Sequence, residues 1–155
     1  MEAITKNRVR EIVESDDARV LLAMFDEDPS RVRRFLTRLA FAPDDACHMH
    51  TIECFEMLSL KRSDRMPDFF LEIIRRSLWE MNEEGGNVSW SAPEIIGAVI
   101  AGSPDRFGDY FSYMFYAAID EPTFQPSLLA AFERVCIVRP LLVQDFEEQV
   151  QALRA

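Results

Sequence analysis

Glycine, histidine, cysteine and tryptophan are all scarce in this chain, and their scarcity argues against several classes of function. Its 155 residues include 5 glycines, 2 histidines, 3 cysteines and 2 tryptophans. The adjacent pair Gly85 and Gly86 is typical of a turn, and no glycine-rich sequence is present that would cradle a phosphate group. The cysteines are odd in number and irregularly spaced, which argues against a disulfide framework and favours a reducing cytoplasm. They are Cys47, Cys54 and Cys136.

Long apolar runs and an excess of basic charge are also missing. The longest apolar run, from Ile95 to Ala101, is far too short to span a bilayer. The opening segment MEAITKNRVREIVESDD has no apolar stretch of the kind that a secretory signal needs. Acidic residues outnumber basic ones by 27 to 17, and the formal net charge of -10 repels phosphate backbones and anionic lipids. We therefore expect a cytoplasmic protein that binds neither nucleic acid nor membranes.

The pattern of apolar residues predicts an all-helical chain. Apolar positions recur with a period close to 3.6, and neither the alternation of a strand nor an Asn-Gly or Asp-Gly hairpin signal is evident. Four prolines follow short polar stretches, where the first position of a helix accepts proline: Pro29, Pro67, Pro104 and Pro140. We predict helices near 3–14, 17–27, 29–40, 47–61, 67–81, 91–102, 104–119 and 126–153, the last broken at Pro140. No linker divides the chain, so we expect one domain over 1–155.

The spacing of three prolines indicates an internal repeat. Pro29, Pro67 and Pro104 lie 38 and 37 residues apart, and the apolar positions that follow them coincide. Three, six and seven residues after the prolines stand Val32, Phe35 and Leu36, then Phe70, Ile73 and Ile74, then Phe107, Tyr110 and Phe111. Helix pairs of this length bury their apolar faces by stacking on one another. We predict a short α-solenoid of about three helical hairpins over 29–138, capped by helices in 1–28 and 139–155. A helical bundle with a coincidental period is the alternative.

The segment WSAPEIIGAVIAGSPDRF, residues 90–107, resembles a HEAT-like repeat, including the short variety found in the phycobilisome-lyase-like group of bacterial proteins. A small residue, Ala-Pro-Glu, an apolar pair and glycine open one helix, and Ser-Pro begins the next unit. The resemblance covers roughly 29–138, although Thr51-Ile52-Glu53-Cys54 replaces Ala-Pro-Glu in the first unit. It implies a scaffold that binds other macromolecules, usually proteins, and it implies no specific activity.

The richest cluster of ligating side chains is CHMHTIEC, residues 47–54. On a helix Cys47, His50 and Cys54 fall at i, i+3 and i+7 on one face, and thiolate with imidazole suits zinc or copper(I). A tetrahedral site needs a fourth ligand, and Cys136 is the one remaining cysteine. We favour the alternative that both cysteines are small buried hydrophobes with His50 at an edge. No nucleophile and base are spaced for catalysis, so we expect no enzyme, no metal and no other cofactor.

The turns within the helix pairs hold most of the candidate partner-binding residues. Stacked hairpins would bring these acidic turns together as a ridge along one edge. The candidates are Asp44, Asp45, Glu83, Glu84, Asp120 and Glu121, with Trp90 and Glu94 beside them. A partly basic surface is expected on the turns at the opposite edge and on the first helix of each predicted pair. Its residues are Arg31, Arg33, Arg34, Lys61, Arg62, Arg65, Arg75 and Arg76. Both groups are also compatible with solvated faces. We expect Trp79, Tyr110, Tyr113 and Tyr116 to pack in the core.

The hypothesis that follows is a non-enzymatic protein–protein interaction scaffold, which binds its partner through a charged edge or a concave face. An enzymatic alternative is a HEAT-like glycosylase acting on alkylated DNA bases, or a chromophore lyase. The net charge of -10 opposes the DNA reading, because such enzymes need a strongly basic face. A third alternative is a metal- or redox-responsive protein that uses Cys47, His50 and Cys54.

Overall fold

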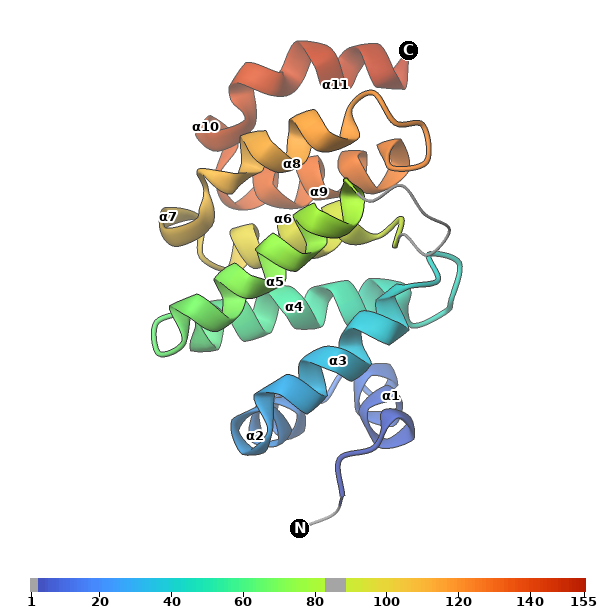
Figure 1. The fold of residues 1–155 in the computed structure, drawn as a ribbon, viewed down its shortest axis with the longest axis vertical. Coiled ribbons are helices and arrows are strands. Elements are labelled where there is room, and N and C mark those ends of the chain that lie inside the picture. Colours follow the sequence, from blue (N-terminus) through green and yellow to red (C-terminus); the bar gives the residue numbers. More distant parts are fainter. Residues whose placement is uncertain (1–2, 83–88) are drawn as a thin grey trace.

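All regular structure in the part of the chain that the structure describes, residues 3–82 and 89–155, is helical (Figure 1). The structure is a computed structural model of the full chain. Its longer helices are α1 (Lys6–Glu14), α2 (Ala18–Glu27), α3 (Pro29–Ala40), α4 (His48–Arg62), α5 (Pro67–Met81), α6 (Ala92–Gly102), α8 (Tyr110–Ala118), α9 (Gln125–Val138) and α11 (Glu147–Arg154). Short turns of helix connect some of them: α7 (Pro104–Phe107), α10 (Pro140–Val143) and the 3-10 helix η1 (Gln144–Phe146). The all-helical prediction is confirmed for these residues.

Helix starts follow from local chemistry. The side chain of Thr5 accepts a hydrogen bond from the Arg8 N–H at the start of α1, and Asp28 accepts one from the Arg31 N–H at the start of α3. Such caps satisfy N–H groups that have no partner inside the helix. Pro29, Pro67, Pro104 and Pro140 each stand at a first helical position, as predicted.

One expected helix is divided in two. The pattern predicts a continuous helix over 104–119, but the chain bends at Gly108 between α7 and α8. A Cβ atom at Gly108 would lie 2.6 Å from the Pro104 carbonyl oxygen and 3.2 Å from the Leu142 side chain. Glycine therefore permits the close approach of Leu142 to the bend, a contact from the far end of the chain that local periodicity does not encode.

The helices form two layers that follow the order of the chain. In one layer α4 packs against α6 and α6 against α9; in the other, which lies in front of it in Figure 1, α5 packs against α8. The helix α3 contacts α4, while α5 and α8 both contact α6. The α1–α2 pair and α11 lie at opposite ends of the long axis (Figure 1). No helix among the described residues is long and apolar enough to cross a membrane.

Helix α6 is the centre of the core, and every residue from Ala92 to Gly102 is buried. Its neighbours approach closely because small residues face them. A Cβ on Gly97 would lie 2.7 Å from the Cβ of Ala131 in α9, and one on Gly102 would lie 2.5 Å from the Glu56 carbonyl oxygen in α4. The hydroxyl of Ser59 donates to the Val99 carbonyl of α6 at 2.7 Å, which ties α4 to the same helix. Burial of α6 on all sides is therefore a consequence of its composition.

Candidate functional site

The acidic turns lie along one edge of the molecule where the structure describes them. The α3–α4 and α8–α9 connections are on the same side in Figure 1, and Asp44, Asp120 and Glu121 are exposed. Glu83 and Glu84, which belong to the middle of the expected ridge, lie outside the described residues. Trp90 is 54% exposed, so it is available for contact rather than part of the core.

Two of the acidic candidates, Asp45 and Glu94, have carboxylates that already bind other side chains of the protein. The Asp45 carboxylate lies 2.9 Å from Arg10 Nη2 and also accepts a hydrogen bond from the Cys47 N–H. The hydrogen bond from Cys47 and the Arg10 guanidinium hold the pKa of the Asp45 carboxyl well below its usual range. Asp45 is therefore a poor candidate for binding another protein, because its carboxylate oxygens already accept hydrogen bonds from Arg10 and Cys47.

Glu94 is a correction to the predicted surface. It is only 9% exposed, and both carboxylate oxygens lie 3.2–3.3 Å from Nε2 of His48. Its N–H donates to the hydroxyl of Ser127 in α9. Glu94 therefore joins three helices inside the molecule, and it is not accessible to a partner. Local sequence does not indicate this burial, because it depends on the packing of α4 and α9 against α6.

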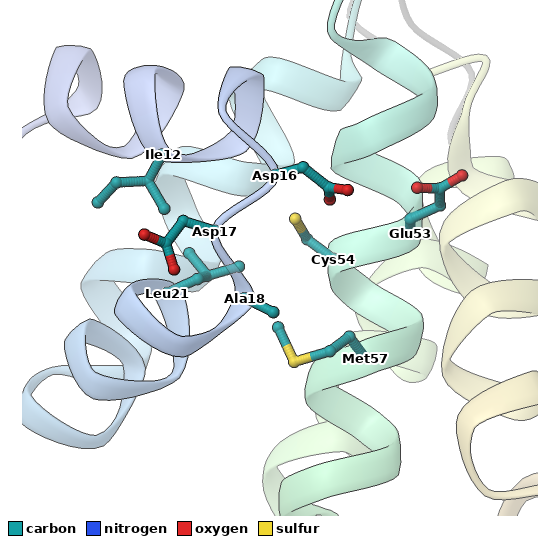
Figure 2. A pocket seen from close by; sticks show the side chains of 8 residues that line it. All are labelled: Ile12, Asp16, Asp17, Ala18, Leu21, Glu53, Cys54 and Met57. Carbon is teal, nitrogen blue, oxygen red and sulfur yellow. The ribbon is translucent and has the colours of Figure 1, made fainter.

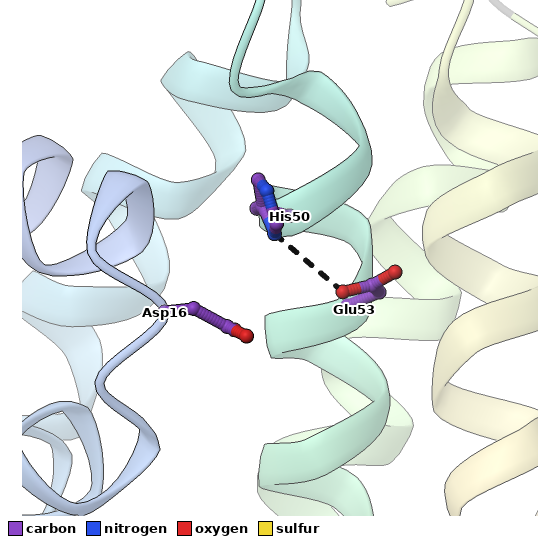
Figure 3. A group of neighbouring side chains, drawn as sticks. All are labelled: Asp16, His50 and Glu53. Carbon is purple, nitrogen blue, oxygen red and sulfur yellow. Dashed lines mark ion pairs between the residues drawn. The ribbon is translucent and has the colours of Figure 1, made fainter.

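Cys47, His50 and Cys54 do not form a shared group of ligands among the described residues. Cys47 is buried just before α4, and burial raises the pKa of its thiol. Cys54 is half-buried and lines a cavity of about 200 Å³ between α4 and the α1–α2 turn (Figure 2). His50 instead lies beside Glu53, with 3.7 Å between Nδ1 and Oε2, and it faces Asp16 across the gap to that turn (Figure 3).

The basic candidates separate into two groups. Some complete the fold: the Arg62 guanidinium binds the Asp26 carboxylate at 2.7 Å, and Arg31 donates to the Ile4 carbonyl. Others line a cleft between α3 and α5 with a volume of about 250 Å³. Its walls and floor are formed by Arg33, Arg34, Thr37 and Arg38 of α3, by Ile73, Arg76, Ser77 and Glu80 of α5, and by Ile95 of α6. We call this the arginine cleft.

Positive charge in the arginine cleft is poorly compensated. Within residues 3–82 and 89–155, no carboxylate forms an ion pair with Arg33, Arg34 or Arg38. Burial lowers the pKa of Arg33, and the nearby guanidinium of Arg76 lowers it further. The Glu72 carboxylate, which forms an ion pair with Arg76 at 3.3 Å, acts in the opposite direction on the pKa of Arg33. The acid on the cleft wall, Glu80, is half-buried, and burial raises the pKa of its carboxyl. An anion entering the cleft would relieve this repulsion.

Three aromatic side chains that the sequence assigns to the core are exposed on α5 and α8. Trp79 of α5 is 63% exposed, and Tyr113 and Tyr116 of α8 are 65% and 61% exposed. The expectation that they pack in the core is wrong. On α5 the buried side chains, among them Ile74 and Met81, lie on one side of the helix, and Trp79 falls on the opposite side. The helical position of Trp79 relative to Pro67 and the apolar residues that follow it indicates exposure. Its residue type alone does not.

Comparison with known proteins gives no identity for the chain. No family model, no curated protein and no solved structure matches it. Function is therefore inferred from the residues themselves, and the arginine cleft is the surface whose chemistry is the most distinctive.

Proposed function

We propose that this protein is a non-enzymatic interaction scaffold, a short α-solenoid of the HEAT-like kind, which docks an acidic segment of a partner protein in the arginine cleft. The HEAT-like part of the proposal is supported by the order of packing. Each hairpin contributes one helix to each layer, and α4, α6 and α9 contact one another in chain order. The free state of all three cysteines is in keeping with a cytoplasmic location, which is also part of the proposal.

The single observation that carries the docking proposal is the clustering of Arg33, Arg34, Arg38 and Arg76 around one cleft of a molecule whose net charge is -10. Guanidinium groups bind carboxylates through two parallel hydrogen bonds, and such pairs gain strength when they are partly shielded from water. Three of these arginines have no ion-pair partner among the described residues. A carboxylate-rich peptide supplies the missing anions.

The composition of the surrounding surface supports a protein partner. Arginine, tryptophan and tyrosine are the residues most enriched among the energetically dominant positions of protein interfaces. Trp79 lies on the same helix as Arg76, and α5 packs beside α8, which carries Tyr113 and Tyr116. The apolar floor of the cleft, Ile73 and Ile95, is suited to a segment in which acidic and apolar residues are mixed.

A nucleic acid is the less favoured occupant. Its backbone also carries anions, but a net charge of -10 opposes the approach of a long polyanion at low ionic strength. A short acidic peptide senses mainly the local field of the cleft. Low-salt gel-shift titration with duplex and single-stranded DNA is the corresponding test, and binding at micromolar protein would favour the glycosylase alternative over docking of a protein.

The docking proposal is tested with a fluorescein-labelled peptide of alternating glutamate and leucine residues, whose binding is followed by fluorescence anisotropy. Replacing Arg33 and Arg76 by glutamine should weaken binding at least fivefold, because two guanidiniums are lost from opposite walls. The matched control replaces Arg19 and Arg65, which are exposed and outside the cleft, and it changes the net charge equally. Equal weakening in both variants, or no binding by the unmodified protein, would overturn the proposal.

A further inference from the structure

A second group of side chains has the composition of a metal site. It lies where α4 faces the turn between α1 and α2 (Figure 3). The ligand atoms of Asp16, His50 and Glu53 all lie within 4.8 Å of one another. Asp16 comes from the turn between α1 and α2, whereas His50 and Glu53 are one helical turn apart on α4 (Figure 3). The arrangement joins segments that are more than thirty residues apart in sequence.

The position of Asp16 is fixed by the backbone. Its φ of 56° lies in the left-handed region, where aspartate is tolerated better than most residues. The N–H of Asp16 donates to the Val13 carbonyl and the N–H of Asp17 donates to the Ile12 carbonyl. These bonds join the turn to the end of α1 and fix its conformation, and the Asp16 carboxylate faces His50 (Figure 3).

The donor atoms of the group have few partners within the protein. Among the described residues, neither Asp16 nor Glu53 forms an ion pair with lysine or arginine. Nδ1 of His50 is shielded from water and has no hydrogen-bond partner, and its distance to Glu53 is 3.7 Å. Two carboxylates and the imidazole of His50 therefore converge, and no lysine or arginine among the described residues forms an ion pair with these carboxylates. A divalent cation would balance the charge and use the nitrogen lone pair.

A thiol lies next to the group. Cys54 is one residue after Glu53 and lines the cavity beneath Asp16, with its sulfur facing the turn that carries Asp16 (Figure 2). Its sulfur is not among the ligand atoms that lie within 4.8 Å of one another, so it would reach an ion bound there only by rotation of its side chain.

We propose that Asp16, His50 and Glu53 form a site for a divalent transition metal, with zinc as the ion of choice and Cys54 or water as the fourth ligand. Oxygen, nitrogen and sulfur donors together suit Zn²⁺, whereas Mg²⁺ and Ca²⁺ take oxygen ligands. Zinc ligands lie about 2.0–2.3 Å from the ion, so the three side chains close inward by rotation on binding. If Cys54 coordinates, one thiol proton is released to solvent for each ion bound. The site is separate from the arginine cleft, so either proposal stands without the other.

The test is a zinc titration of the metal-free full chain in competition with a chromophoric chelator. The unmodified protein should bind one Zn²⁺ per chain with an affinity at least tenfold higher than Asp16→Asn or His50→Gln. The control Asp120→Asn removes an exposed carboxylate elsewhere and should leave the affinity unchanged. Circular dichroism establishes that each variant is folded. Failure to compete, or equal affinity in all four proteins, would overturn the proposal and identify only adventitious carboxylate binding.

Cobalt(II) identifies the ligands by absorption. Visible bands of four-coordinate Co²⁺ should appear on titration of the unmodified protein and should be absent from His50→Gln. A near-ultraviolet thiolate-to-cobalt band that disappears in Cys54→Ser would assign the fourth position to Cys54, and its absence from the unmodified protein would assign that position to water. Visible bands that persist in His50→Gln would contradict the site.

Discussion

Arg134 of α9 binds Glu56 of α4 with 2.9 Å between Nη1 and Oε1, although α6 lies between the two helices. The bridge is possible because α6 presents small residues to both neighbours, so that α4 and α9 approach closely. As a result α6 contributes no exposed residue to the layer that α4, α6 and α9 form. The arginine cleft is lined mainly by α3 and α5, each the first helix of its pair.

Adding one methyl group to α6 should destabilise the protein. In Gly102→Ala the new Cβ would meet the Glu56 carbonyl oxygen at 2.5 Å, and a backbone atom cannot rotate away. We expect a loss of about 1–3 kcal/mol in the free energy of unfolding, measured by urea denaturation. Gly97→Ala meets the Cβ of Ala131 at 2.7 Å and is expected to behave similarly. Unfolding midpoints equal to that of the unmodified protein would contradict the packing described for α6.

The buried pair of His48 and Glu94 should show strong coupling in a double-mutant cycle. Glu94→Leu leaves the His48 ring inside the core without its partner, and we expect a loss of about 3 kcal/mol in stability. His48→Leu should be comparably harmful, because the carboxylate is then left unpaired. The double variant, which removes both polar groups, should be more stable than either single one. Additive losses would show that the two side chains do not interact.

The Asp45 carboxylate should contribute to stability in a pH-dependent way. Its pKa in the folded protein is lowered, so its contribution is complete above the ordinary value of 3.8 and is lost as the pH falls below that value. Asp45→Asn should therefore be less stable than the unmodified protein at pH 7, and the difference should shrink progressively in acid. Thermal unfolding between pH 7 and pH 2, with Asp44→Asn as the control, measures this. A difference independent of pH would contradict it.

Removing an exposed aromatic side chain should separate binding from stability. Trp79→Ala deletes a residue that is 63% exposed, so we expect a change of less than about 0.5 kcal/mol in the free energy of unfolding. Phe70→Ala, one of the fully buried positions of the same helix, should cost about 3–5 kcal/mol. The affinity for the acidic peptide should fall in Trp79→Ala. It should not fall in Phe70→Ala if that variant is folded, because the net charge is the same in both. An unchanged affinity would confine docking to the cleft itself.

The sequence predicted the helices far better than the surfaces. Helix starts were evident because proline and the capping residues act locally, as at Pro29 and Asp28. Periodicity does not predict the bend at Gly108, where a Cβ atom would meet both the Pro104 carbonyl oxygen and the side chain of the distant Leu142. Periodicity also does not predict the burial of Glu94, because a carboxylate near a helix start is usually exposed and His48 lies 46 residues away.

The candidate sites differ in how far they could be foreseen. The sequence places Arg33, Arg34 and Arg76 in predicted helices, but their convergence on one cleft depends on how α3 and α5 are placed. For His50, helical spacing predicts Cys47 and Cys54 as the neighbouring ligands. The neighbour that the fold supplies is Asp16, which belongs to no motif and comes from a turn with positive φ.

The central claim, that an acidic segment docks between α3 and α5, is tested most directly by mapping amide chemical shifts during titration with the glutamate–leucine peptide. We expect the largest perturbations at Arg33, Thr37, Ser77 and Glu80, which line the cleft, and small ones at Asp44 and Asp120 on the acidic edge. Perturbations confined to the acidic edge, or spread evenly over the surface, would contradict the claim.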